Sequence, residues 1–246
     1  ARASLAILRA AGDYVDPNSM PSRLRGLLAT AAKEASVGAS AGSANQSGER
    51  QADDQHVRAV FLARTGDFTR ALEAEGDAVR LYRRLLEHDP LRFKAKLAER
   101  LNNVANRLAD LGRRDDALAP SKEAVALWRE LVAIDPPPHL DGLATALSNL
   151  SARLFALGQS EEGVATAVEA VGIYRRMVTA NGDLGRPQLA YSLSMLANWQ
   201  SSIGRFEDAL SSSSESTNLY RQLVAKDRDR YQPSLAATLT GLARDL

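Results

Sequence analysis

The sequence predicts an all-α solenoid of stacked helix-turn-helix repeats, and three observations support this prediction. Residues of the same kind recur at a constant step of 46 along most of the chain. Apolar residues within each repeat follow the three-and-four spacing of an amphipathic helix. The chain is 45% hydrophobic and rich in the helix formers Ala and Leu, and no stretch alternates apolar and polar residues as a strand would.

The N-terminal part falls outside the repeat register. Residues 1–35 predict two short amphipathic helices that form a hairpin, with a turn around Pro17. Residues 36–50 consist of Ser, Gly, Ala and polar residues, which predicts a flexible linker. The hairpin fits two roles. It caps the first repeat, which we favour, or it docks as an internal ligand in the solenoid's own groove, where a short tether would keep its effective concentration high.

Residues 51–246 contain the repeats, about four of them followed by a final single helix. Four columns of residues keep one register without insertion or deletion. They are the glycines Gly66, Gly112, Gly158 and Gly204, the aromatics Tyr82, Trp128, Tyr174 and Tyr220, and two leucine columns that begin at Leu97 and Leu101. The common register of these four columns indicates that one structural unit is repeated along the chain.

Each repeat is expected to contain two helices. In the best-formed repeat, one apolar stripe covers residues 97–111, and Gly112 supplies the conformational freedom to end that helix and turn. A second stripe covers 115–134 behind an acidic start, which suits a helix N-terminus. The prolines at 136–138 stop this second helix.

Two further features fit stacked helix pairs. Pro187 and Pro233 are expected to begin the first helices of later repeats, because the first turn of a helix tolerates proline. A column of small residues in the second helices lets neighbouring helices approach closely. It comprises Ala71, Ala117, Gly163 and Ala209. One repeat cannot bury both stripes alone, whereas stacked repeats can.

Stretches such as residues 101–118 and the helix that follows resemble tetratricopeptide repeats. The matching residues are Leu101, Val104, Ala105 and Leu108 in the first helix, Gly112 in the turn, and Ala117 and Ala124 in the second helix. The resemblance covers roughly Asp53 to Leu246 and implies a right-handed α-solenoid. The step of 46 residues, instead of the usual 34, looks most like the extended repeats common in high-GC actinobacteria and in some fungi. Residues 233–246 are either a terminal capping helix or part of a further repeat of a longer parent protein. We favour the second, because this last helix keeps the ordinary apolar pattern instead of the polar outer face of a cap.

Composition excludes several classes of function. Lys and Arg number 31 against 30 Asp and Glu, so the basic excess typical of nucleic-acid binding is missing. No apolar run reaches the roughly 18 residues of a membrane span, and the first residues do not read as a signal peptide. The chain has no cysteine, which fits a reducing compartment, and we expect a cytoplasmic protein.

The sequence offers no catalytic or cofactor motif. His56, His88 and His139 lie at unrelated register positions, and no pair has metal-ligand spacing on one helix. The sequence contains neither a phosphate-binding glycine loop nor a dinucleotide fingerprint. Acidic pairs such as Asp115-Asp116 and Glu161-Glu162 recur at one register position, which marks them as helix-start residues. We therefore expect neither an enzyme nor a bound cofactor or metal.

The resemblance implies that the first helices line a concave groove in which a protein or peptide lies. The inward-facing candidates are Asn102, Asn106, Ser148, Phe155, Tyr191, Ser194 and Asn198. The Asn side chains offer both a donor and an acceptor to a bound backbone. The family's basic clamp for a C-terminal carboxylate is missing, since Asn102 and Ser148 occupy its lysine position. Binding to a chaperone tail is therefore not expected.

The aromatic column that begins at Tyr82 and the side chain of Trp199 each allow two interpretations. The Tyr82 column, with an arginine after each member, is expected to pack between repeats and to leave the arginines solvated. A stacking platform for single-stranded nucleic acid is the less favoured alternative. Trp199 either fills the space left by the polar Gln200 in the apolar column, which we favour, or stands exposed at a contact surface.

The resemblance and the lack of catalytic motifs lead to one hypothesis about function. The chain is expected to be a protein- or peptide-binding scaffold, the interaction or sensor portion of a larger regulatory or signalling protein. The alternative is a self-assembly module, in which open repeat ends pair chains as a homo-oligomer.

Overall fold

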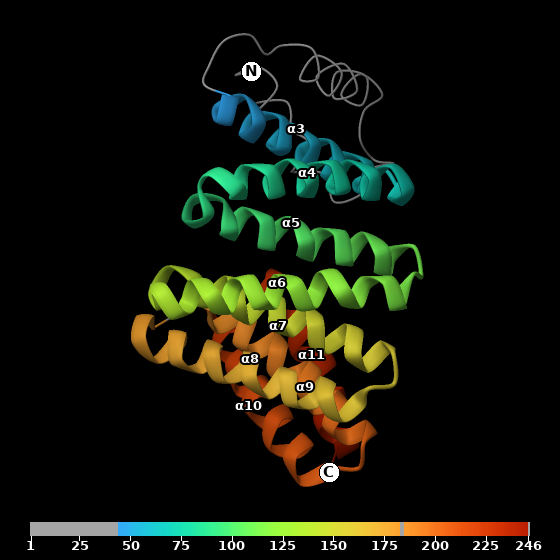
Figure 1. Cartoon of the computed structure of the whole chain (residues 1–246). Coiled ribbons are helices and arrows are strands. Elements are labelled where there is room, and N and C mark those ends of the chain that lie inside the picture. The colour runs from blue at the N-terminus through green and yellow to red at the C-terminus, as the bar shows by residue number, and fades with distance from the viewer. Residues whose placement is uncertain (1–43, 183–184, 246) are drawn as a thin grey trace. The chain divides into compact units, whose positions relative to one another are not determined.

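The computed structural model describes residues 44–182 and 185–245, and every regular element within them is an α-helix (Figure 1). The helices are α3 (Ala44–Arg64), α4 (Phe68–His88), α5 (Pro90–Asp110), α6 (Arg114–Ile134), α7 (Pro136–Ala156), α8 (Ser160–Asn181), α9 (Arg186–Ser202), α10 (Phe206–Lys226) and α11 (Arg228–Asp245). The expected hairpin over residues 1–35 lies outside the described residues.

The chain divides into two compact units, and the boundary between Pro120 and Ser121 falls inside α6. In the first unit, α4 packs against both α3 and α5. In the second unit, α7 packs against α8, α8 against α9, α9 against α10, and α10 against α11. Within each unit, these helices pack on their neighbours in the chain, which confirms the predicted fold of stacked helix-turn-helix repeats.

The glycine column forms the turn within each helix pair. Gly112 has a φ of +73°, in the left-handed region that favours glycine. Its N–H donates to the carbonyl of Ala109, and the N–H of Arg113 donates to the carbonyl of Leu108, each over 2.9 Å. These bonds satisfy carbonyls that the helix end leaves unpaired. Gly66, Gly158 and Gly204 also have positive φ values.

The aromatic column lies in the core, as the sequence predicts. Tyr82 is fully buried, and Trp128, Tyr174 and Tyr220 are each less than 10% exposed. The Tyr82 hydroxyl donates to Asp53 Oδ1 of α3 over 2.5 Å, so a polar group inside the core has a partner. The arginine after each aromatic is exposed. This burial excludes the alternative of a nucleic-acid stacking platform.

The small-residue column permits close packing, also as predicted. Ala71, Ala117 and Ala209 are fully buried. At Gly163, an added Cβ would lie 3.2 Å from the carbonyl oxygen of Ser151 in the preceding helix. A larger side chain there would push the two helices apart.

Two helices begin earlier than the sequence predicts. Residues 44–50, expected in the linker, form the first turns of α3. Two tertiary contacts explain the difference: Gly48 lets α3 approach Leu85 of α4 closely, and Glu49 pairs with Arg92 of α5 at 2.5 Å. Pro187 lies in the first turn of α9, as expected, but Pro233 lies inside α11, which already begins at Arg228.

Candidate functional site

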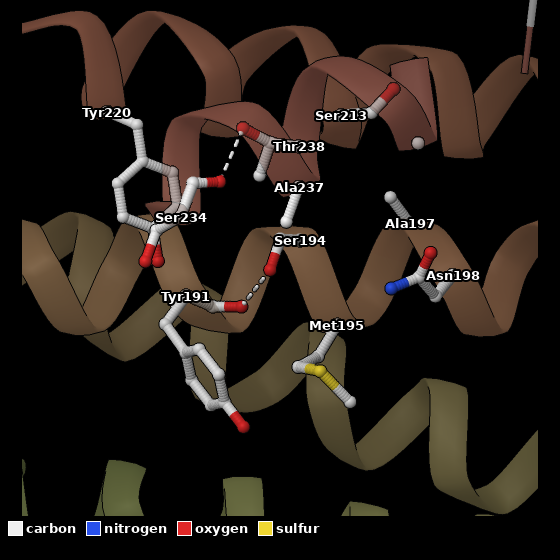
Figure 2. A pocket seen from close by; sticks show the side chains of 11 residues that line it. Tyr191, Ser194, Met195, Ala197, Asn198, Ser213, Tyr220, Ser234, Ala237 and Thr238 are labelled. Carbon is white, nitrogen blue, oxygen red and sulfur yellow. Dashed lines mark hydrogen bonds between the residues drawn. The ribbon is translucent and has the colours of Figure 1, made fainter. Parts of the chain in front are cut away.

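A pocket of about 250 Å³ lies in the second unit, where α9, α10 and α11 meet (Figure 2). It is lined by Tyr191, Ser194, Met195, Ala197 and Asn198 of α9, Ser213 and Tyr220 of α10, and Ser234, Ala237, Thr238 and Gly241 of α11. Alanine, glycine and hydroxyl-bearing residues dominate this lining. The pocket therefore offers hydroxyl groups on a mostly apolar wall that carries no formal charge.

The three predicted residues of α9 meet at this pocket. Tyr191, Ser194 and Asn198 are spaced by three and four residues, so they share one face of the helix. Tyr191 is 58% exposed, which is unusual for a large aromatic side chain, and it forms part of the rim. In Figure 2 these three residues lie on one side of the pocket, and Tyr220, Ser234 and Thr238 lie on the other.

Several hydroxyl groups in the pocket already use their single donor within their own helix. Ser194 Oγ donates to the carbonyl of Tyr191 over 2.9 Å, and Thr238 Oγ1 donates to the carbonyl of Leu235 over 2.9 Å. Ser213 Oγ donates to the carbonyl of Leu210 over 3.2 Å. A hydroxyl has one donor and two acceptor lone pairs. The oxygens of these residues therefore keep the capacity to accept hydrogen bonds.

Tyr220 forms a buried wall of the pocket. It belongs to the aromatic column, and only 5% of its surface is exposed. Burial raises the pKa of the Tyr220 phenol, although a hydrogen bond with Ser234 acts in the opposite direction. The phenol is therefore neutral at physiological pH, and the wall stays uncharged.

Sequence reasoning missed the residues that α10 and α11 contribute. It considered only the inward positions of first helices, whereas the pocket also needs Ser213 from a second helix and Thr238 from the following first helix. A signal was present: Ser213 shares its register position with Glu75, Ser121 and Ala167, a column of mostly small residues. A small residue between two helices leaves the space that becomes the pocket.

Two other predicted residues of the second unit lie elsewhere. Ser148 Oγ donates to the carbonyl of Ala144 over 2.9 Å and lies 3.4 Å from Ser192 Oγ. The ring of Phe155 stacks on Trp199, with ring centroids 5.4 Å apart. Neither Ser148 nor Phe155 lines the pocket.

Trp199 is 8% exposed, so the alternative of an aromatic standing exposed at a contact surface is wrong. The favoured interpretation also needs correction, because Gln200 leaves no empty space. Gln200 is itself buried and accepts a hydrogen bond from Ser212 Oγ over 2.8 Å. Both residues therefore pack in the core of the second unit.

The remaining predicted residues, Asn102 and Asn106, belong to α5 in the first unit. Both are partly buried, and both take part in interactions with other residues. They lie four residues apart and share a helix face, as the sequence predicts. Their role as ligand contacts stays a prediction.

In the described part of the chain, no group of three His, Cys, Asp or Glu side chains could hold a metal ion. The acidic pairs Asp115-Asp116 and Glu161-Glu162 lie in the first turns of α6 and α8, as predicted for helix-start residues. None of the described helices combines the length and apolarity of a membrane span.

Comparison with known proteins identifies the repeat type. Residues 55–91 and 97–138 each match the model of the tetratricopeptide repeat family, and together they are less than half of the chain. The first match extends from α3 to the start of α5, and the second from α5 to the start of α7. No curated protein matches the sequence.

Three solved structures share the fold at low sequence identity. The apo form of RapI has a TM-score of 0.65 at 11% identity, covering 82% of this chain and 66% of that one. BtubC (BKLC) from P. vanneervenii has a TM-score of 0.64 at 15% identity, covering 82% and 73%. The putative kinesin light chain of Podosopora anserina, with nearly identical TPR-like repeats, has a TM-score of 0.59 at 20% identity, covering 78% and 84%. Together with the two matched segments, these folds support a tetratricopeptide repeat protein.

Proposed function

We propose that this chain is a scaffold that binds a protein or peptide along the faces of its first helices, with the pocket of α9, α10 and α11 as one contact point. The observation that carries the proposal is a pocket lined by several hydroxyl-bearing residues beside an exposed tyrosine. Tetratricopeptide repeats are non-catalytic scaffolds as a kind, and an interaction role agrees with this lining.

The chemistry of the pocket favours a ligand that donates hydrogen bonds. Ser194, Ser213 and Thr238 direct their donors into their own helices, so N–H groups of a peptide would meet free lone pairs. Asn198 adds an amide at the rim, and Tyr191 adds an aromatic surface that a ligand could cover. Tyrosine is enriched at interaction hot spots, because it brings a large contact area at a small entropy cost.

A peptide-display selection on the full chain tests the proposal. The selected peptide is labelled, and its affinity is measured by fluorescence anisotropy for the wild type and for Tyr191→Ala. We expect Tyr191→Ala to weaken binding at least tenfold, as loss of a hot-spot aromatic does. Phe206→Ala is the matched control, since Phe206 is 60% exposed, lies in α10 and does not line the pocket.

Two outcomes would count against the proposal. One is a selection that yields no peptide with saturable binding. The other is equal weakening by the Tyr191 and Phe206 substitutions, which would place the contact away from the pocket.

The wider biological setting is part of the same proposal. We propose that the chain is the interaction or sensor portion of a larger regulatory or signalling protein in the cytoplasm, with extended repeats of the actinobacterial type. Residues 1–35 are a proposed cap of the array or, alternatively, an occupant of its groove. Comparing the affinity of the selected peptide for the full chain and for residues 44–246 distinguishes these roles, because only a competing occupant would lower the affinity of the full chain.

A further inference from the structure

A second pocket, of about 270 Å³, lies in the first unit among α3, α4 and α5. His56 and Val60 of α3, Glu75 of α4, and Asn103 of α5 contribute to its lining. Three steps of the 46-residue repeat separate these residues from Ser194, Asn198, Ser213 and Gly241, which line the pocket of the second unit. The two pockets are therefore the same niche of the repeat, built twice with different side chains.

The side chain that changes the chemistry of this niche is Glu75. Ser121, Ala167 and Ser213 occupy the same position in the other repeats, so the first repeat alone places a carboxylate there. The Glu75 side chain is 3% exposed, and its Oε1 lies 2.7 Å from His56 Nδ1. Its Oε2 is buried and has no hydrogen-bond partner among the described residues.

A buried carboxylate oxygen without a partner is costly, because folding removes its water without replacing the hydrogen bond. The sequence of the other repeats shows that the niche tolerates serine or alanine at this position, so packing does not require glutamate. Glu75 is therefore best explained by something that donates a hydrogen bond to Oε2 and is not part of the described chain.

The other side chains that line the niche indicate what kind of group carries that donor. Ala59, Ala63 and Val60 of α3 form an apolar wall, and Val60 is 38% exposed. Arg107 also lines the niche, but its Nη1 pairs with Asp110 Oδ2 at 3.2 Å. Arg64 is exposed at the end of α3, where water and salt screen its charge. The buried charge that faces a ligand is thus the negative one of Glu75.

We propose that the niche of the first unit binds a lysine or arginine side chain of the partner. The aliphatic stem lies along Val60 and Ala63, and the charged head donates to Glu75 Oε2, as long basic side chains do when they cross an apolar surface to reach a carboxylate. This inference rests on the proposed scaffold function and adds the chemistry of the ligand: a basic residue in the first unit, and neutral N–H donors in the second.

Amide NMR titration of the full ¹⁵N-labelled chain tests the inference. The probes are Nα-acetyl-arginine amide and Nα-acetyl-lysine amide, with Nα-acetyl-norleucine amide as the uncharged probe and Nα-acetyl-glutamate amide as the acidic probe. We expect saturable shifts at Val60, Glu75 and Asn103 with the basic probes only. Glu75→Ser, which restores the residue of two other repeats, should weaken binding at least tenfold, and Glu75→Gln should do so with the side-chain shape retained. Glu73→Ser removes an exposed charge from the same helix and should leave binding unchanged.

Equal binding by wild type and Glu75→Gln overturns the inference, as does the lack of saturable shifts with either basic probe. Preferential binding of the acidic probe also overturns the inference. It would mean that Arg64 and Arg107, and not Glu75, determine which charge the niche binds. These failures are distinguishable from failure of the scaffold function, because the peptide selected against the full chain would still respond to Tyr191→Ala.

Discussion

Two glycines inside helices of the second unit have opposite surroundings. A Cβ added at Gly142 would lie 2.6 Å from the ring of Trp128, whereas a Cβ added at Gly172 meets nothing within 4 Å. The Trp128 indole is 7% exposed and packs beside His139, so it cannot move aside freely. Gly142 is therefore required by packing, and Gly172 only lowers helix propensity.

We expect Gly142→Ala to lower the free energy of unfolding by about 1–3 kcal/mol through overpacking. Gly172→Ala should raise it by roughly 0.5–1 kcal/mol, because alanine loses less backbone entropy in a helix. Urea unfolding followed by circular dichroism measures both changes. Destabilisation by both substitutions would contradict the assignment of the Gly142 effect to Trp128.

At the residue scale, the repeat columns predict the surroundings of some side chains but not of others. Tyr220 and Gly163 could be assigned to the core and to a close helix contact because each has equivalents in every repeat. Glu75 and Gln200 differ from the residues at the same register position in the other repeats. The sequence therefore does not indicate which side chains they contact. Their hydrogen bonds to His56 and Ser212 depend on side-chain positions in three dimensions that a single sequence does not contain.

At the element scale, second helices of neighbouring repeats are joined by a repeated ion pair. Arg129 of α6 pairs with Glu169 of α8 at 2.7 Å, and Arg175 of α8 makes two hydrogen bonds to Glu215 of α10. This hydrogen bonding raises the pKa of the Arg175 guanidinium, so the pair stays ionised. The same step of 40 residues separates the two members of each pair.

We expect a double-mutant cycle of Arg175→Ala and Glu215→Ala to give a coupling of about 0.2–1 kcal/mol in low salt, because the pair is exposed. At 1 M NaCl the Debye length falls to about 3 Å, and the coupling should disappear. Arg176→Ala, at the exposed neighbouring position, is the control and should show no coupling to Glu215→Ala. A coupling that persists in high salt would point to packing of the side-chain stems instead of charge.

Two residue types, proline and aspartate, can mark where a helix begins in the sequence. Pro233 was an incorrect marker for the start of α11, since a helix that begins at Arg228 places this proline in its interior. Asp227 shares its column with Asp89 and accepts a hydrogen bond from the N–H of Arg230 over 3.2 Å, as a helix cap does. At α11 the capping aspartate marks the helix start better than the proline does, because capping satisfies a free N–H. By contrast, nothing in the composition of residues 44–50 predicted a helix, because tertiary contacts with α4 and α5 stabilise it.

At the scale of the whole molecule, the regular 46-residue step predicted stacked helix pairs but not the division into two units. The register continues unbroken through the boundary at Pro120, which lies inside α6. Helix α6 continues through Pro120 as one helix, so neither the helix nor the repeat register marks the boundary. The repeat pattern reports only what the repeats have in common, so it gives no signal for the division.

The alternative of a self-assembly module can be tested against the exposed apolar side chains of the described residues. Stable homo-oligomers bury contiguous apolar surfaces. In the described part of the chain, the large exposed apolar residues are Val57, Val60, Leu91, Ile134, Val168, Tyr191, Phe206 and Leu239, and only the first two share a helix. We therefore expect light scattering coupled to size exclusion to give a mass near the 26.5 kDa of one chain from micromolar concentrations to at least tenfold higher. A mass that rises with concentration would favour self-assembly, and repeating the measurement with residues 44–246 would show whether residues 1–43 are needed for it.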